Sequence, residues 1–415
     1  MHPDLDCAVI GGGAAGLAAA IFIRRWNPQA SVAILEKGPR VGKKLSVTGN
    51  GTCNLTNLRA DSSHYHGADP AFVLPALAAF PPAEACSFFS SIGVECCERE
   101  EGRVYPLCLQ ASAVLDCLRT EARALGAEEC CATEVSAIRP IDGAFRMKLA
   151  QTELCARKVV VAVGGAAAPA QGGSASGYGL LTALGHTKTP LFPSIVQLTT
   201  DTAYVRAVSG VRIDGGVSLS LDGRRLGSAQ GDVLFTEYGL SGPAVMQLSR
   251  FAGDWERTKR GAMSAHLDLL PTIAPDDLRL LLAGRRHLPG RLLEDYLTGL
   301  VQKRLGQTVL RAAGIGPLSR PADSLTSREV ACVAAMLKDW PISVTGTRGM
   351  GGAQVTAGGI STAETDPRTM ESRKAPGLFL AGEVLDIDGD CGGYNLHWAW
   401  ASAHAAASGV CLSLA

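Results

Sequence analysis

"DCAVIGGGAAGLAAAIFIRRWNPQASVAILEKG", residues 6–38, is the stretch that decides the fold. The apolar residues 7–10 predict a strand, the glycines after them predict a tight turn, and a helix is expected up to about Trp26. Asn27 and Pro28 end this helix, and residues 31–36 predict a second strand. A strand, glycine turn, helix and strand in this order predict a parallel α/β sheet of the Rossmann type.

The glycine turn fits the pattern GxGxxG, in which each glycine has a physical role. Gly11 allows the tight turn, Gly13 lets the backbone approach a pyrophosphate, and Gly16 lets the helix pack closely on the strand. The N-terminus of the helix stabilises the phosphate charge. Glu36 lies 20 residues beyond Gly16 (36 minus 16) and is expected to accept hydrogen bonds from ribose hydroxyls. These residues predict a dinucleotide site and leave FAD and NAD both open.

Three further blocks favour the longer cofactor, FAD. "EKGPRVGKKLSVTGNGTCNLTN", residues 36–57, forms a long polar loop in which Gly49 and Gly51 flank Asn50, and it suits a ligand that continues past the pyrophosphate. "KVVVAVGGAAAP", residues 158–169, predicts a buried strand that returns to the dinucleotide. "APGLFLAGEVLDIDGDCGGYN", residues 375–395, predicts another strand, followed by acids and glycines.

Together these blocks resemble a family of FAD-binding flavoproteins that includes aminoacetone oxidase and a 3-dehydro-bile acid reductase. The matching stretches are "VIGGGAAGLAAA", "GKKLSVTGNGTCNLTN", "VAVGG", "LFTEYGLSGPAVMQLS", "VTAGGI" and "GLFLAGEVLDIDGDCGGYNLHWAWASA". They follow one another in the family's order over almost the whole chain. The resemblance implies FAD as the cofactor, an FAD domain similar to that of glutathione reductase, and an oxidoreductase activity.

The motifs and the resemblance predict one set of FAD contacts. Gly392 and Gly393, at the start of a terminal helix, are expected to present backbone N–H groups to the isoalloxazine ring, where negative charge develops on reduction. Asp386 is expected to bind ribityl hydroxyls or to be solvated. The full predicted set is Gly11, Gly13, Ala14, Ala15, Gly16, Glu36, Lys37, Lys44, Thr48, Gly49, Asn50, Cys53, Asn54, Val135, Ala162, Gly164, Gly165, Gly382, Glu383, Asp386, Gly392, Gly393, Tyr394, Asn395 and Leu396.

Between its two ends the chain changes pattern, which predicts domains inserted into the FAD domain. Alternating apolar and polar residues, with Asp214-Gly215 and Asp222-Gly223 as hairpin turns, predict an antiparallel β-domain. Helix starts at Pro275 and around Thr326 predict a helical subdomain after it. The expected parts are residues 1–187 (FAD domain), 188–262 (barrel-like β-domain), 263–340 (helical subdomain) and 341–415 (return strands and the rest of the FAD domain).

No catalytic acid or base can be identified from sequence. Glu237, Tyr238 and Ser241 are candidates for substrate contact, although Ser241 is equally suited to cap a helix that starts at Pro243. His397 is expected to be packed or flavin-adjacent. Cys53 and Cys391 are interpreted as small buried thiols in preference to a redox-active pair.

Composition excludes several classes of function. The 39 basic and 39 acidic residues cancel, and aromatic residues are 5%, which argues against nucleic acid as a partner. The 13 cysteines include no CxxC pair, so reduced thiols, a cytoplasmic location and no metal site are expected. The pair His64 and His66 lacks further ligands. Residues 8–23 are too short to span a bilayer, so no membrane partner is expected.

The sequence leaves three functions open. The preferred one is reduction of an activated C=C of a small organic substrate, steroid-like or bile-acid-like, as the resemblance implies. NAD(P)H would then dock transiently, because no second GxGxxG motif is present. The alternatives are an aminoacetone or amine oxidase that passes electrons to O2 and releases H2O2, and a non-catalytic flavin-binding regulatory protein. The oligomeric state stays open.

Overall fold

Strand β1 (Leu5–Ile10) lies inside a seven-stranded sheet of order β7-β2-β1-β10-β9-β8, with β19 paired to β10. The other strands are β2 (Val32–Leu35), β7 (Glu128–Cys130), β8 (Ala137–Ile141), β9 (Ala144–Lys148), β10 (Glu153–Val161) and β19 (Leu378–Leu380). The computed structural model describes residues 3–415. The expected α/β fold of Rossmann type is confirmed.

The register of the parallel strands determines where the predicted motifs lie. Leu35, Ile10, Val161 and Leu380 stand side by side at the carboxyl ends of β2, β1, β10 and β19. Glu36, Gly11 and Ala162 come directly after Leu35, Ile10 and Val161, and Gly382 lies two residues after Leu380. Ligands of open α/β sheets bind at such an edge.

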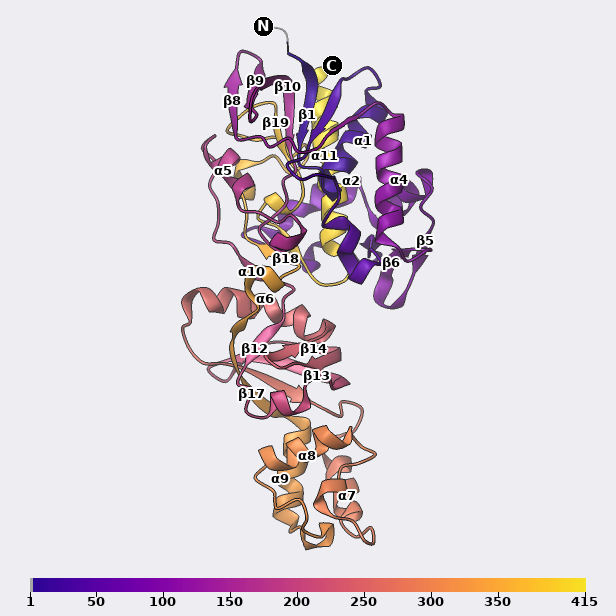
Figure 1. Ribbon diagram of the computed structural model, residues 1–415, viewed down its shortest axis with the longest axis vertical. Helices are drawn as coiled ribbons and strands as arrows, with labels where there is room; N and C mark the ends of the chain where they lie inside the picture. The colour runs from indigo at the N-terminus through magenta and orange to yellow at the C-terminus, as the bar shows by residue number, and fades with distance from the viewer. Residues whose placement is uncertain (1–2) are drawn as a thin grey trace. The chain divides into compact units, whose positions relative to one another are not determined.

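Two helices from opposite ends of the sequence pack against each other in this unit. Helix α1 (Ala14–Trp26) is buried along most of its length, and α11 (Tyr394–Leu414) contacts it (Figure 1). The indole N–H of Trp398 donates to Gly382 O, and that of Trp400 donates to Leu55 O. Helix α11 therefore joins the late strand β19 to the early loop after β2.

The remaining elements of this unit are short. Its helices are α2 (Leu74–Ala79), α3 (Pro82–Ser91), α4 (Ala111–Ala124) and α5 (Ser176–Thr182). In one small sheet β6 (Arg103–Pro106) pairs with both β3 (Thr56–Asn57) and β5 (Cys96–Glu98). In two others β4 (Tyr65–His66) pairs with β20 (Asp388–Gly389), and β11 (Phe192–Ser194) with β18 (Val355–Ala357). This first unit comprises the chain up to Phe192 together with Gln354–Ala415.

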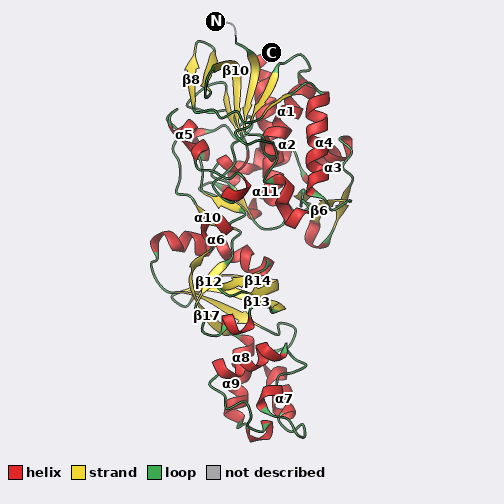
Figure 2. Cartoon of the chain, viewed as in Figure 1, coloured by secondary structure: helices red, strands yellow, loops and turns green. Residues whose placement is uncertain are grey.

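The second unit, Pro193–Ala353, contains a closed barrel and a group of helices (Figure 2). The barrel order is β12-β15-β14-β13-β16-β17, with bounds β12 (Leu198–Thr200), β13 (Arg212–Leu221), β14 (Arg224–Phe235), β15 (Gly239–Ser241), β16 (Met263–Asp268) and β17 (Trp340–Thr347). The helices are α6 (Pro243–Thr258), α7 (Pro275–Arg285), α8 (Lys303–Ala312), α9 (Ser327–Lys338) and α10 (Gly349–Gly352).

Several local predictions for this unit can be compared with the structure. The turn at Asp222-Gly223 joins β13 to β14 as predicted, and Thr326 forms a capping box with Glu329 at the start of α9. The turn predicted at Asp214-Gly215 is wrong, because both residues lie within β13, opposite Asp232 and Gly231. Two strands, β16 and β17, fall in the stretches expected to be helical or to return to the FAD domain.

Helix α6 begins at Pro243 as predicted, but Ser241 does not cap it. The N-cap is Gly242, which makes no side-chain cap, and Ser241 is the last residue of β15. Within residues 3–415 no single helix is long and apolar enough to cross a bilayer. Pro70–Ala79 and Pro82–Ser91 reach that length and composition only as a pair bent by 49°.

Candidate cofactor-binding site

The glycine turn after β1 is shaped by contacts at two of its glycines and open at a third. A Cβ on Gly11, where φ is +103°, would lie 2.4 Å from Ala162 O, and one on Gly16 would lie 1.9 Å from Gly11 O. No atom lies within 4 Å of the position of a Cβ on Gly13, and no side chain caps α1 there. The first N–H groups of α1 are therefore accessible beside an open backbone face, which fits a pyrophosphate.

Glu36 is fixed beside this turn by two backbone donors. Its Oε2 accepts from Gly12 N at 2.8 Å, and its Oε1 accepts from Gly38 N at 2.7 Å. Each carboxylate oxygen keeps a lone pair for a further donor, as a ribose hydroxyl would supply. Thr133 N donates to Glu36 O at 2.8 Å and brings the buried Val135 to the same strand end, whereas Lys37 is exposed.

The ends of β10 and β19 complete this edge of the sheet. Gly382 lies against Ala15, with 3.0 Å between a Cβ on Gly382 and Ala15 Cβ, and Gly164 faces open space. Both carboxylate oxygens of Glu383 have partners within the protein. Its Oε2 pairs with Lys44 Nζ at 2.8 Å, and its Oε1 accepts from Thr356 N at 2.8 Å. This ion pair ties the loop after β2 to the segment after β19.

A second group of predicted residues surrounds the N-terminus of α11. Gly393 is the N-cap of α11 with φ at +102°, and a Cβ there would lie 2.5 Å from Thr56 O and 2.8 Å from Asn54 Oδ1. Two non-glycine residues of the facing loop, Asn50 and Cys53, also have left-handed backbone, with φ at 55° and 58°. The loop after β2 and the glycines before α11 are thus in close contact, as the predicted cofactor set requires.

Asn54 supplies the test of whether these residues fit a flavin. Its Oδ1 is buried and has no hydrogen-bond partner among residues 3–415. A buried acceptor without a donor is costly in a folded protein, so a ligand that brings an N–H group stabilises this site. The isoalloxazine ring carries such a group. The residues present fit FAD, with the glycine turn and Glu36 for its adenosine diphosphate part and the Asn54–Gly393 contact for its ring.

A family comparison agrees with this geometry. The family model described as "HI0933-like protein Rossmann domain" matches residues 5–409. The chain belongs to this HI0933-like family. It is 37% identical over 403 residues to the 3-dehydro-bile acid delta(4,6)-reductase of Clostridium scindens, covering 96% of this chain and 97% of the relative. It is 30% identical over 410 residues to the ribosomal RNA dihydrouridine synthase of Haemophilus influenzae, covering 97% of each.

Solved structures show the same fold at low sequence identity. The 3-ketosteroid delta1-dehydrogenase of Sterolibacterium denitrificans superposes with a TM-score of 0.53 at 13% identity and covers 99% of both chains. The E. coli quinol fumarate reductase subunit superposes with a TM-score of 0.51 at 20% identity, covering 99% of this chain and 70% of that one. Site geometry, family and relatives together identify the HI0933-like protein as an FAD-dependent oxidoreductase.

In the HI0933-like protein, side chains at the start of α11 hold the turn that precedes this helix. Asn395 Oδ1 accepts from Gly389 N at 2.8 Å and its Nδ2 donates to Gly389 O at 2.7 Å, so this predicted cofactor residue holds the turn. The Tyr394 ring stacks on His64 with 4.3 Å between centroids. The buried Asp386 receives a hydrogen bond from Ala68 N at 3.3 Å, and Leu396 is half-buried.

The two histidines of "HYH" share one carboxylate. His64 Nδ1 lies 3.0 Å and His66 Nε2 lies 2.8 Å from the oxygens of Asp390. Burial acts to raise the pKa of Asp390, but the hydrogen bonds from His66 and His64 outweigh it and lower that pKa. No group of three or more His, Cys, Asp or Glu side chains placed to hold a metal occurs within residues 3–415.

His397 and Cys53 are buried, whereas Cys391, also expected to be a buried thiol, is half-buried. His397 Nδ1 lies 2.9 Å from Thr56 Oγ1, its Nε2 is buried without a partner within the described chain, and burial lowers its pKa to about 4. Burial raises the pKa of Cys53 to about 12 and also raises that of Cys391. His397 is therefore neutral near pH 7, and both thiols stay protonated.

The substrate-side candidates Glu237, Tyr238 and Ser241 belong to the second unit. Glu237 and Tyr238 lie at the turn between β14 and β15, and Ser241 is the last residue of β15. The guanidinium of Arg348 lies 4.6 Å from the centre of the Tyr238 ring. Arg348 was not a candidate from sequence. The predicted cofactor residues, in contrast, all belong to the first unit.

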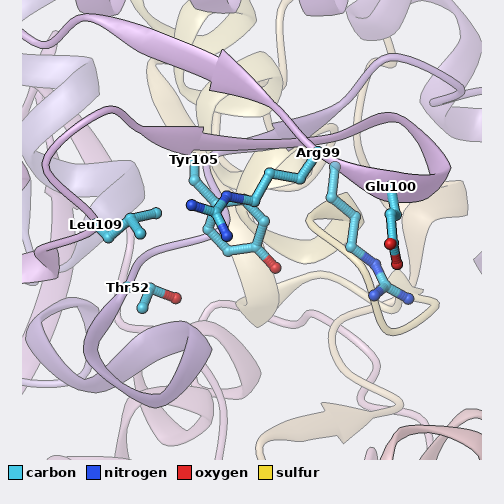
Figure 3. A pocket seen from close by; sticks show the side chains of 6 residues that line it. Thr52, Arg99, Glu100, Tyr105 and Leu109 are labelled. Carbon is cyan, nitrogen blue, oxygen red and sulfur yellow. The ribbon is translucent and has the colours of Figure 1, made fainter.

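The structure also reveals a pocket that sequence reasoning missed. It has a volume of about 550 Å³ and is lined by Thr52, Arg99, Glu100, Arg103, Tyr105 and Leu109 (Figure 3). Only Thr52 lies within a stretch that the sequence analysis singled out, the loop of residues 36–57. The other residues are brought there by β6, whose Arg103 is paired in register with Asn57 of β3. No sequence motif marks them.

Proposed function

We propose that the HI0933-like protein reduces a C=C bond conjugated to a carbonyl, with NAD(P)H as the hydride donor. The observation that carries this proposal is the 37% identity to the bile-acid delta(4,6)-reductase over nearly the full length of both chains. The name of the second class of relatives, ribosomal RNA dihydrouridine synthase, describes the same kind of bond, because uracil has a C=C bond next to a carbonyl. Both names therefore support reduction of an enone-type system.

The chain's own residues would contribute positioning and electrostatics. Bound FAD supplies hydride transfer. The N–H groups at the start of α11, from Gly393 onward, favour negative charge next to them. Asn54 Oδ1 orients a ring N–H group. Backbone donors of the turn at Gly13 would hold the pyrophosphate, so the two ends of the cofactor would be held by separate groups of residues.

A small organic substrate is preferred to RNA as the acceptor. The formal net charge of zero gives no general basic excess for phosphate binding. The 30% identity to the ribosomal RNA enzymes keeps uridine in ribosomal RNA as the second candidate substrate. The relatives named as enzymes do not favour a non-catalytic flavin-binding role. Aminoacetone, oxidised with O2 as the electron acceptor, is the third candidate substrate.

Anaerobic stopped-flow spectroscopy tests the proposal. We expect NADH or NADPH to bleach the flavin absorption, and an unsaturated 3-oxo steroid to restore it in the absence of O2. Unmodified ribosomal RNA serves as the competing oxidant in a parallel trace. Bleaching by aminoacetone alone, with recovery only in air, would contradict the proposal and favour the oxidase.

A further inference from the structure

The pocket beside the glycines of α11 has the form of a ligand site. Its volume of about 550 Å³ is in the range of small-molecule pockets. We propose that this pocket binds the anionic end of the substrate, a carboxylate attached to a flat apolar body, through Arg99 and Arg103. This inference rests on the proposed function and adds the substrate class to it.

Arg99 is the uncommitted cation of the pocket. Within residues 3–415 its side chain takes part in no ion pair or side-chain hydrogen bond. An arginine carries five N–H donors in a planar fork that matches a carboxylate. A carboxylate bound there gains charge-assisted hydrogen bonds without displacing a protein partner.

Arg103 is paired only at its outer side. Its Nη2 lies 2.6 Å from Glu101 Oε2, but the Glu101 side chain is 63% exposed. An ion pair this exposed contributes little and exchanges easily. Glu100 lines the pocket and Glu101 pairs with Arg103, so the charges of two glutamates balance those of the two arginines. With no surplus of positive charge, the pocket suits a single carboxylate held by directed donors better than a polyanion such as RNA.

The pocket lining also includes an apolar and an aromatic side chain. These are Leu109 and the half-buried ring of Tyr105. Burial raises the pKa of Tyr105, which Arg103 and Arg99 offset in part, so both arginines act on this ring and its hydroxyl stays protonated. Apolar and aromatic surface in a pocket with uncommitted arginine donors is complementary to an amphipathic acid.

The pocket adjoins the segments predicted to hold the flavin. A Cβ on Gly392 would lie 3.5 Å from Arg103 Nε, and Asn57 Nδ2 donates to Gly392 O at 2.9 Å. On the other side, Thr52 directly follows the 3-10 segment Leu45–Gly51. A carboxylate held by Arg99 and Arg103 therefore places the rest of the substrate beside both segments.

Binding of an acid and its ester tests this inference without turnover. The probes are 3-oxo-4-cholenoate and its methyl ester, titrated into the oxidised holoprotein while the flavin absorption spectrum is recorded, with no donor present. We expect the acid to bind at least about tenfold more tightly than the ester, because a carboxylate gains charge-assisted hydrogen bonds. Arg99→Gln and Arg103→Gln should each remove most of this preference.

Matched variants keep the result interpretable. Arg139→Gln changes an exposed arginine of β8 and should keep the tenfold preference. Arg99→Lys, which retains the charge, should restore part of it. Flavin content and melting temperature show whether each variant is folded.

Two results would overturn the inference: equal affinity of the wild-type protein for acid and ester, or folded Arg99→Gln and Arg103→Gln variants that keep the full preference for the acid. The titration contains no electron donor, so it measures substrate binding independently of the proposed reaction. A failure of NAD(P)H to reduce the flavin would contradict the proposed reaction but not the binding of the carboxylate.

Discussion

At the scale of single residues, Gly13 and Gly16 share one turn but differ in the space around them. Gly16→Ala places a methyl group 1.9 Å from Gly11 O and should lower the free energy of unfolding by about 1–3 kcal/mol or more. Gly13→Ala meets no atom within 4 Å and should cost about 1 kcal/mol or less, as a weaker N-cap. Thermal melts of both variants measure this difference.

FAD retention gives the functional half of the same comparison. If the pyrophosphate lies against Gly13, a methyl group there displaces it, and Gly13→Ala should lose at least about tenfold in FAD affinity while staying folded. The bound flavin per chain after dialysis provides the measurement. Unchanged FAD affinity in folded Gly13→Ala would place the pyrophosphate elsewhere.

His397 makes a prediction about pH. Burial lowers its pKa from 6.5 to about 4, so the folded protein favours the neutral ring and the unfolded chain binds the proton first. Stability from this group is complete above about pH 6.5 and is lost as the pH falls towards 4, by about 3 kcal/mol in total. His397→Gln should flatten the decline in melting temperature between pH 7.5 and 5.

A matched comparison isolates His397, because burial also lowers the pKa of His186 and His404. His404→Gln should leave the contribution of His397 to the pH dependence intact. An unaltered pH profile in His397→Gln would show that the ring is not protonated on unfolding in this range.

At the scale of elements, α3 and β5 bring two half-buried thiols together. Cys86 of α3 accepts a hydrogen bond from Cys96 of β5, which lowers the pKa of Cys86 to about 7 and raises that of Cys96. Iodoacetamide at pH 7.5 should therefore label Cys86 early, since the thiolate is the nucleophile. Peptide mass spectrometry over time follows the labelling.

Removal of the donor tests this thiol contact. Cys96→Ala should slow the alkylation of Cys86 several-fold, because its thiolate loses the hydrogen bond. Cys117→Ala, on α4, should not alter that rate. Equal rates in wild type and Cys96→Ala would show that the two thiols do not interact.

The elements also show which features sequence can predict. The β1–turn–α1–β2 unit was predictable because its strand, glycines and helix are contiguous, and Gly16 is required by a contact within it, with Gly11 O. Strand β16 was missed because it pairs with β13 and β17, and its partners in β17 lie more than seventy residues away (Leu267 pairs with Trp340, and 340 minus 267 is 73). Periodicity in one segment does not contain such pairing.

The pocket residues were missed for a related reason. Thr52 lies in the predicted cofactor loop, but Arg99 belongs to no motif, and the two residues meet only because β6 pairs with β3. From sequence, Arg99 is indistinguishable from a solvated surface arginine. The glycine-rich parts of the candidate site were predictable because backbone geometry restricts the residue type there, whereas substrate-side residues are set by the ligand.

At the scale of the whole molecule, all predicted cofactor residues lie in the first unit. Replacement of residues 195–353 by a short Gly-Ser linker should therefore leave a chain that binds FAD, since β11 and β18, which flank the excision, pair with each other. Flavin absorption after gel filtration measures this. A folded variant without flavin would show that the second unit supplies essential cofactor contacts.

Strand β10 has consequences for the order in which the protein matures. It pairs on one side with β1 and also carries β19, which follows the entire second unit in the chain. A growing chain on the ribosome must therefore synthesise the barrel and its helices before Gly382 and Gly393 exist. Flavin loading thus reports on completed translation: a chain interrupted inside the second unit has the phosphate turn but lacks the residues that would close on the ring.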